Sequence, residues 1–269
     1  MNVDDTKKMI SSRYGMVPYH TTIHTTTLLI LALEATVPTH LPIPSYTMLY
    51  RRVAYYSLLS SYAVDAYLSK AETMMHLTLW SWCLQILYFE LPVPTAQENN
   101  SYSKLLPILH GPAFTGAHAL FAMYLWTLYA NPQMEYDLAP KGRPGWVILA
   151  RAAWFHALPV VLQWYDLQQI GTLLHHRVYQ PLLQSLSSPW KRYGVYFWMA
   201  VGGYFAMGLT WEQVNGDATG TYKVQHVSPE TFVNVSKALG VTACVASFVG
   251  GFWPVLLQSD PEEDKAKKI

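Results

Sequence analysis

The sequence LLPILHGPAFTGAHALFAMYLWTLYANPQM, residues 105–134, contains no formally charged side chain. Two further stretches, 193–211 and 238–259, lack charge in the same way. An α-helix rises about 1.5 Å per residue, so that about 20 apolar residues cross a hydrocarbon core about 30 Å thick. These stretches therefore predict an all-α, multipass membrane helix bundle.

The composition of the chain supports this class of protein. Of its 269 residues, 18 are Lys or Arg and 17 are Asp or Glu, while 51% are hydrophobic and the mean hydropathy is +0.11. This share of charged residues is about half that of a soluble domain. The net charge of +1, without a basic stripe, offers no electrostatic surface for nucleic acid. Cys83 and Cys244 lie far apart inside apolar stretches, which argues against a disulfide framework or a zinc site. We therefore expect no metal, no cofactor and no nucleic-acid partner, whereas a bound phospholipid fits this class.

The apolar runs divide the chain into three parts. Residues 1–49 form an N-terminal tail whose apolar run, 21–37, is expected to lie at the membrane interface or to pack on the bundle, with a true span as the alternative. Residues 50–258 form a six-helix transmembrane domain, and residues 259–269 form a polar C-terminal tail. Prolines, glycines and charges place the six core spans at about 50–68, 74–91, 112–130, 145–163, 193–211 and 232–257.

Cationic side chains stand where two of these spans begin. Arg51, Arg52, Lys191 and Arg192 lie on the side of the bundle that collects more Lys and Arg, which is the cytosolic or matrix side of a membrane. These four side chains are candidate ligands for anionic lipid headgroups. The alternative is that they reach the interface without a specific ligand and only set the orientation of the chain.

Polar side chains inside the spans are the candidates for chemistry, because a polar group at membrane depth needs a partner or a function. Thr78, Ser81 and Gln85 follow the spacing i, i+3 and i+7 and share one helix face. A threonine hydroxyl becomes a nucleophile when a histidine base lies within hydrogen-bond reach. His118 and His156 are the candidate bases. The alternative is that these groups only form hydrogen bonds between helices.

Four stretches, in order, resemble the androgen-induced-gene family of multipass membrane proteins, which also contains the androgen-dependent TFPI-regulating protein. They read HLTLWSWCLQILYF at 76–89, YLWTLYANPQMEY at 124–136, WEQVNG at 211–216 and YKVQHVSP at 222–229. The first is similar to the second span of the family and the second to the end of its third span. The last two are similar to a late loop pattern of Trp, Val and Gly followed by Tyr and His-x-x-Pro.

The resemblance implies a reaction. Enzymes of this family hydrolyse fatty-acid esters of hydroxy fatty acids with a threonine of the second span and a histidine of the fourth. The Leu-Thr context and the downstream Gln85 place the threonine at Thr78. A gap-free comparison places the His-x-x-His pair of the family at Arg151 and Trp154, so that Trp154 falls at the expected histidine position. His156 lies two residues further along, turned by about 200° around a helix.

Two functions follow. The first is a catalytically degenerate member that acts as a structural, lipid-contacting accessory subunit of a larger membrane complex, with other membrane subunits as partners. The mitochondrial inner membrane, with a respiratory or ATP synthase assembly, is the expected location, and the endoplasmic reticulum or plasma membrane is the alternative. The second function is a membrane threonine hydrolase of fatty-acid esters of hydroxy fatty acids, with Thr78 as nucleophile and His156 as base.

Overall fold

The computed structural model describes residues 43–68, 76–93, 105–134, 144–174, 188–215 and 227–256. Its elements are the α-helices α3 (Ile43–Leu68), α4 (Leu77–Glu90), α5 (Leu105–Ala130), α7 (Gly145–Leu174), α9 (Pro189–Phe197), α10 (Gly203–Asn215) and α12 (Pro229–Leu256), together with the π-helix η4 (Trp198–Gly202). No strand occurs within these ranges, so the all-α prediction is confirmed for this part of the chain. The apolar run at 21–37 and the tail at 259–269 lie outside the described residues.

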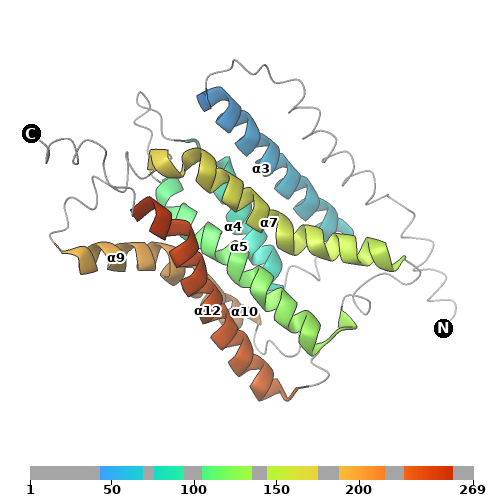
Figure 1. Cartoon of the computed structure of the whole chain (residues 1–269). Coiled ribbons are helices and arrows are strands. Elements are labelled where there is room, and N and C mark those ends of the chain that lie inside the picture. Colours follow the sequence, from blue (N-terminus) through green and yellow to red (C-terminus); the bar gives the residue numbers. More distant parts are fainter. Residues whose placement is uncertain are drawn as a thin grey trace, which may run out of the picture.

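The helix α3 packs antiparallel to α7 along one flank of the bundle (Figure 1). Arg51, near the start of α3, pairs with Asp166 in the second half of α7. Asp65, near the end of α3, pairs with Arg151 in the first half of α7. Two ion pairs spaced along both helices therefore fix the direction and the register of this contact.

The helix α4 runs parallel to α7 and antiparallel to α5. Thr78 at the start of α4 lies against His156 of α7, and Tyr88 near its end contacts Asp166, ten residues further along both helices. Tyr88 also contacts His110 near the start of α5, so α4 and α5 have opposite directions. The helix α4 packs against α3, α5 and α7, and these helices enclose its polar face.

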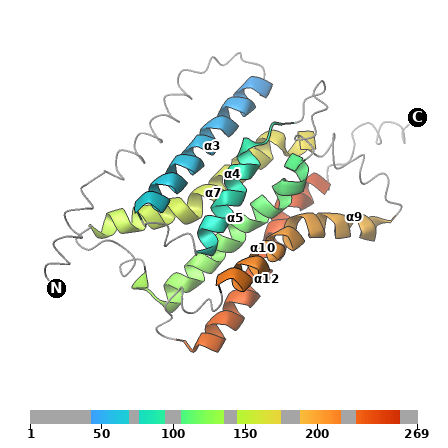
Figure 2. The ribbon, with the colours of Figure 1, turned by 180° about the vertical axis from the view of Figure 1, so that it is seen from behind.

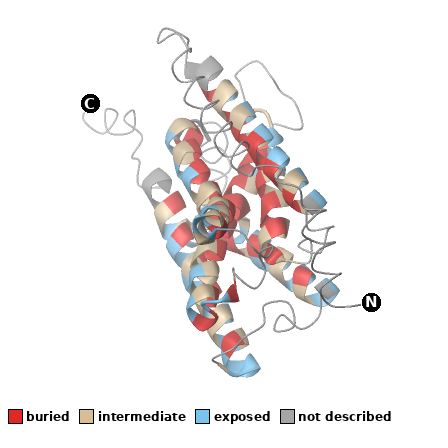
Figure 3. Cartoon of the chain, turned by 90° about the vertical axis from the view of Figure 1, so that its right-hand side faces the viewer, coloured by how far each residue is buried: buried red, intermediate tan, exposed pale blue. Residues whose placement is uncertain are grey.

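The helix α5 lies at the centre of the bundle. Residues 110–117 are all buried, which is the pattern of a helix surrounded by protein. Figure 3 shows that buried residues gather where the helices face one another, with exposed residues along the outer edges. Small residues allow its neighbours to approach closely. A Cβ at Gly111 would lie 2.8 Å from the Cα of Ala200 in η4, and one at Gly251 of α12 would lie 2.5 Å from the Phe114 ring.

The segments α9, η4 and α10 form one continuous but bent helical rod that packs against α5 and lies on the near side of the bundle in Figure 2. The bend includes the five-residue π-helix, in which the backbone hydrogen bonds reach one residue further than in an α-helix. On the N-terminal side of this bend α9 leaves the bundle, and the side chains of Trp190 in α9 and of Trp198, the first residue of η4, are 84% and 72% exposed.

Two of the described helices are long and apolar enough to cross a membrane. They are α7 over Gly145–Gly171 and α12 over Pro229–Gly251. The helix α4 has 14 residues and spans about 21 Å, which is shorter than a hydrocarbon core of about 30 Å. The helix α3 carries Arg51, Arg52 and Asp65 within its length. The six-span arrangement is therefore not confirmed by length and composition.

Two helix limits differ from the sequence prediction. The helix α3 begins at Ile43, seven residues before the expected start at Tyr50, because Pro44 lies in the first turn, where the missing N–H has no intrahelical partner to lose. The helix α7 continues to Leu174 instead of ending near Gln163. The predicted span stops short of Asp166, although Asp166, like Gln163, is completely buried.

Candidate active site

Thr78 lies in the first turn of α4, whose first residue is Leu77. The carbonyl oxygen of His76 accepts the N–H groups of Leu79 and Trp80 at 3.1 and 3.4 Å, which starts the helix immediately before the threonine. The first turn is the end of a helix at which the backbone amides leave a positive partial charge. The half-buried Thr78 hydroxyl is thus placed where negative charge is stabilised.

The imidazole of His156 faces this hydroxyl from α7. Its Nε2 lies 3.4 Å from Thr78 Oγ1, and its Nδ1 lies 2.9 Å from the carbonyl oxygen of Ala152. A carbonyl oxygen only accepts hydrogen bonds, so Nδ1 carries the ring proton. In the neutral ring, Nε2 then has a free lone pair for the proton of the Thr78 hydroxyl. The sequence candidates for nucleophile and base therefore lie beside one another, at a separation slightly longer than the about 2.6–3.2 Å at which a proton is transferred directly.

The side chains at the position expected for the family histidine face another helix. Trp154 donates its indole N–H to Ser61 Oγ of α3 at 3.1 Å, and Arg151 pairs with Asp65 of α3. Because His156 is turned by about 200° from Trp154, it faces α4 instead. Trp154 consequently does not occupy the space beside Thr78. His118, the other candidate base, donates Nδ1–H to Phe114 O at 2.7 Å and stacks on the Phe114 ring.

Further polar contacts join α4 to α7 along the same face. The indole N–H of Trp82 donates to Phe155 O at 2.8 Å, and Gln163 Nε2 donates to Gln85 Oε1 at 2.6 Å. The Gln85 amide also donates to Ala113 O of α5 at 2.7 Å. Together with the Thr78–His156 contact, these bonds form a polar ladder between α4 and α7. Gln85 and Ser81 are buried, so the shared polar face points inward, as its spacing predicted.

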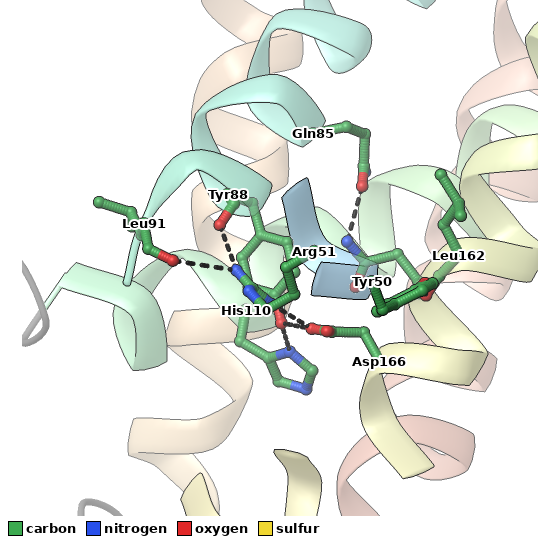
Figure 4. A network of polar contacts seen from close by, with 9 residues as sticks. Tyr50, Arg51, Gln85, Tyr88, Leu91, His110, Leu162 and Asp166 are labelled. Carbon is green, nitrogen blue, oxygen red and sulfur yellow. Dashed lines mark hydrogen bonds and ion pairs between the residues drawn. The ribbon is translucent and has the colours of Figure 1, made fainter. Parts of the chain in front are cut away.

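The far end of the ladder is a buried ionic cluster, which we call the Arg51 cluster (Figure 4). Arg51 Nη1 lies 2.6 Å from Asp166 Oδ2, and Arg51 Nη2 donates to Tyr88 O at 2.6 Å. The Tyr88 hydroxyl donates to Asp166 and lies 2.8 Å from His110 Nδ1. The side chains of Arg51 and Asp166 are only 3% and 0% exposed. The cluster thus connects α3, α4, α5 and α7 out of contact with solvent.

Arg51 was predicted to contact lipid headgroups, and this prediction is wrong. Its guanidinium is turned into the bundle because Asp166 offers a buried carboxylate, and two cation–π contacts with Tyr88 and Phe89 line the path of the side chain. The adjacent Arg52 is exposed. Sequence reasoning also missed Tyr88, His110 and Asp166. The available signal was Asp166 itself, a lone acid on a long apolar stretch.

Lys191 and Arg192 are exposed on α9, next to the exposed Trp190. This placement leaves both side chains accessible to a lipid surface, and headgroup binding by Arg52, Lys191 and Arg192 stays a prediction. Among the described residues, no group of three or more His, Cys, Asp or Glu side chains is arranged to hold a metal ion.

No family model, no curated protein and no solved structure matches this chain. The resemblance to the androgen-induced-gene family therefore rests on the sequence motifs alone.

Proposed function

We propose that this chain is an integral membrane hydrolase that cleaves fatty-acid esters, with Thr78 as the nucleophile and His156 as the general base. The observation that carries the proposal is the 3.4 Å separation of Thr78 Oγ1 from His156 Nε2, with the opposite ring nitrogen held by Ala152 O. A hydroxyl next to a histidine whose other nitrogen is oriented by a third group is the signature of an activated nucleophile.

The reaction takes place in two steps. His156 Nε2 removes the proton from Thr78 Oγ1, which attacks the ester carbonyl carbon; the bond to the alcohol oxygen breaks, and His156 returns the proton to the leaving alcohol. Water then attacks the acyl-threonine, His156 takes a proton from this water, and the acyl–Oγ1 bond breaks to release the fatty acid. Thr78 recovers its proton from His156, so that ester and water yield acid and alcohol. The positive end of α4 favours the negative charge that develops during each attack.

The membrane location is supported by the outer faces of the helices. Large apolar side chains are exposed on several of them, including Leu87 of α4, Leu125 of α5, Val161 of α7, Leu209 of α10 and Val245 of α12. Exposed apolar surface of this extent is typical of contact with lipid or with another membrane protein. We propose a bundle of six membrane-crossing segments in which the polar face of the short α4 is covered by α3, α5 and α7.

The substrate class follows from the resemblance and from this apolar setting. We propose fatty-acid esters of hydroxy fatty acids, whose long chains dissolve in the bilayer. The test is hydrolysis of a palmitate ester of a hydroxystearic acid by the purified full-length chain in mixed micelles. Thr78→Ala is expected to lower the rate by at least about a thousandfold, since the covalent route is lost. His156→Ala is expected to lower the rate by about 10²–10⁴-fold.

Matched controls come from the same fold. Thr210 is an exposed helical threonine whose hydroxyl donates to Ala206 O, and Thr210→Ala should retain activity. His118 shares with His156 the bond from Nδ1 to the carbonyl oxygen four residues earlier but does not face Thr78, and His118→Ala should retain the reaction rate per folded molecule. No ester hydrolysis by the wild-type chain, or activity that survives in Thr78→Ala, would contradict the proposal.

A second candidate function is supported by α9. Trp190, Phe197 and Trp198 are exposed together, beside Lys191 and Arg192. This surface suits a structural, lipid-contacting accessory subunit whose partners are other membrane subunits, with the mitochondrial inner membrane as the proposed location and the endoplasmic reticulum or plasma membrane as the alternative. Stable co-purification with other chains, together with absence of ester hydrolysis, would favour this function over the hydrolase.

A further inference from the structure

The ring of His156 is covered by Tyr124 of α5. The two ring centroids lie 3.6 Å apart and the ring planes differ by 13°, so the phenol and the imidazole are stacked face to face. By comparison, His118 and Phe114 stack at 4.3 Å with 30° between their planes. The imidazole of His156 is therefore held on its face by Tyr124 and at Nδ1 by Ala152 O, while its Nε2 faces Thr78 Oγ1.

Each of these contacts restricts a different movement. The bond from Nδ1 to Ala152 O favours the tautomer protonated at Nδ1 only while the ring keeps its orientation, and this bond alone leaves the ring free to tilt. The Tyr124 ring prevents this tilt, because a stacked aromatic surface permits only in-plane movement. The Thr78 contact at 3.4 Å is too long to orient the ring by itself, since N···O hydrogen bonds are typically about 2.7–3.2 Å.

The stacking of His156 on Tyr124 also affects the charge state of the imidazole. During each step of the proposed reaction the imidazole becomes a cation. The face of an aromatic ring carries negative electrostatic potential and attracts a cation placed over it. Stacking on Tyr124 therefore favours the protonated base that exists only during the reaction, in addition to holding the neutral ring in place.

We propose that Tyr124 is the positioning residue of the His156 base: its ring holds Nε2 toward Thr78 Oγ1 and stabilises the imidazolium. This inference rests on the proposed hydrolase function, but its structural half, the fixed ring of His156, does not depend on activity. This role needs the ring of Tyr124 but not its hydroxyl. It involves no contact between Tyr124 and the substrate.

The kinetic test compares Tyr124→Phe with Tyr124→Leu. Tyr124→Phe keeps the stack and should leave kcat within about twofold, whereas Tyr124→Leu should lower kcat by about tenfold with little change in KM, as expected for the loss of a cation–π contact felt during the chemical step. Tyr129→Leu, at an exposed tyrosine of the same helix, is the matched control and should leave both constants unchanged.

The second readout is the nitrogen NMR spectrum of the histidine-labelled full-length chain, with His156→Gln identifying the signal. The wild type and Tyr124→Phe should show the tautomer with the proton on Nδ1, and Tyr124→Leu should show a mixture of both tautomers. If Tyr124→Leu does not fold, Tyr124→Met fills the same space without a ring. If Tyr124→Leu shows a mixture of tautomers but the wild-type chain does not hydrolyse esters, Tyr124 positions the His156 ring and the hydrolase function is rejected. An unchanged tautomer together with an unchanged kcat would overturn the inference.

Discussion

The Arg51 guanidinium lies 2.6 Å from the Asp166 carboxylate, although the two residues are 115 positions apart in the chain. This pair joins α3 to α7, and Tyr88 of α4 donates a hydrogen bond to the same carboxylate. Removing a buried charge from its partner is expensive, because the remaining charge has neither water nor a counterion. The Arg51 cluster therefore holds α3, α4 and α7 in the register that also brings Thr78 to His156.

Breaking this ion pair should destabilise the bundle strongly. Arg51→Met and Asp166→Leu are each expected to lower the free energy of unfolding by about 3–5 kcal/mol, since each leaves one buried charge uncompensated. The double variant should lose less than the sum of the two. Denaturant unfolding in detergent micelles measures these values, with the exposed neighbour Arg52→Met as the control. A single variant no more destabilised than Arg52→Met would contradict the buried pair.

Breaking the pair of amides formed by Gln85 and Gln163, in the middle of the polar ladder, should also destabilise the bundle, but by less than breaking the Arg51–Asp166 pair. Gln85→Leu leaves Gln163 Nε2 and Ala113 O without their partner in a fully buried site. The expected loss is about 1–3 kcal/mol of unfolding free energy. A double-mutant cycle with Gln163→Leu measures the coupling between the two amides. Additive effects of the two substitutions would show that the amides do not interact.

Two glycines of different helices offer a matched comparison of packing. A Cβ at Gly111 would lie 2.8 Å from backbone atoms of Ala200 and Met199, so Gly111→Ala must separate α5 from η4 and should cost about 1–3 kcal/mol. Nothing lies within 4 Å of a Cβ at Gly194, so Gly194→Ala should stabilise α9 by up to about 1 kcal/mol. Thermal unfolding of both variants tests the pair, and equal shifts in Tm would argue against the close α5–η4 contact.

Anionic lipid should gather at α9. Lys191→Gln combined with Arg192→Gln is expected to weaken the preference for anionic over zwitterionic phospholipid, by about fivefold for each charge removed if each contributes about 1 kcal/mol. Quenching of the exposed Trp190 and Trp198 by brominated phosphatidylglycerol, compared with brominated phosphatidylcholine, measures this preference. Lys237, which is exposed and pairs with Glu212, supplies the control substitution Lys237→Gln. An equal loss in this control would indicate a general charge effect.

The order of the helices could be predicted from the sequence because apolar runs and prolines are local signals. The limits of α3 and α7 could not, since they depend on partners elsewhere in the chain. Pro44 lies before the predicted start of the first span, and Asp166 lies beyond the predicted end of the fourth. Pro44 instead lies in a first turn that tolerates it, and Asp166 is neutralised by Arg51.

The candidate site was predictable in its residue types but not in its geometry. Thr78 and His156 could be named from the polar residues of the spans and from the resemblance. Whether His156 or Trp154 faces α4 depends on the rotation of α7 against its neighbours, which is set by contacts such as Trp154 with Ser61. The inward turn of Arg51 escaped prediction for the same reason, because its partner lies on a different helix.

The central claim is that Thr78 is a nucleophile activated by His156. The most direct measurement is mass spectrometry of the full-length chain after treatment with a long-chain alkyl fluorophosphonate, which is attacked by an activated hydroxyl with loss of fluoride. We predict a single phosphonylated peptide with the added mass on Thr78 in the wild type, and no adduct in His156→Ala. An unlabelled Thr78 in the wild type, or equal labelling in His156→Ala, would contradict the claim.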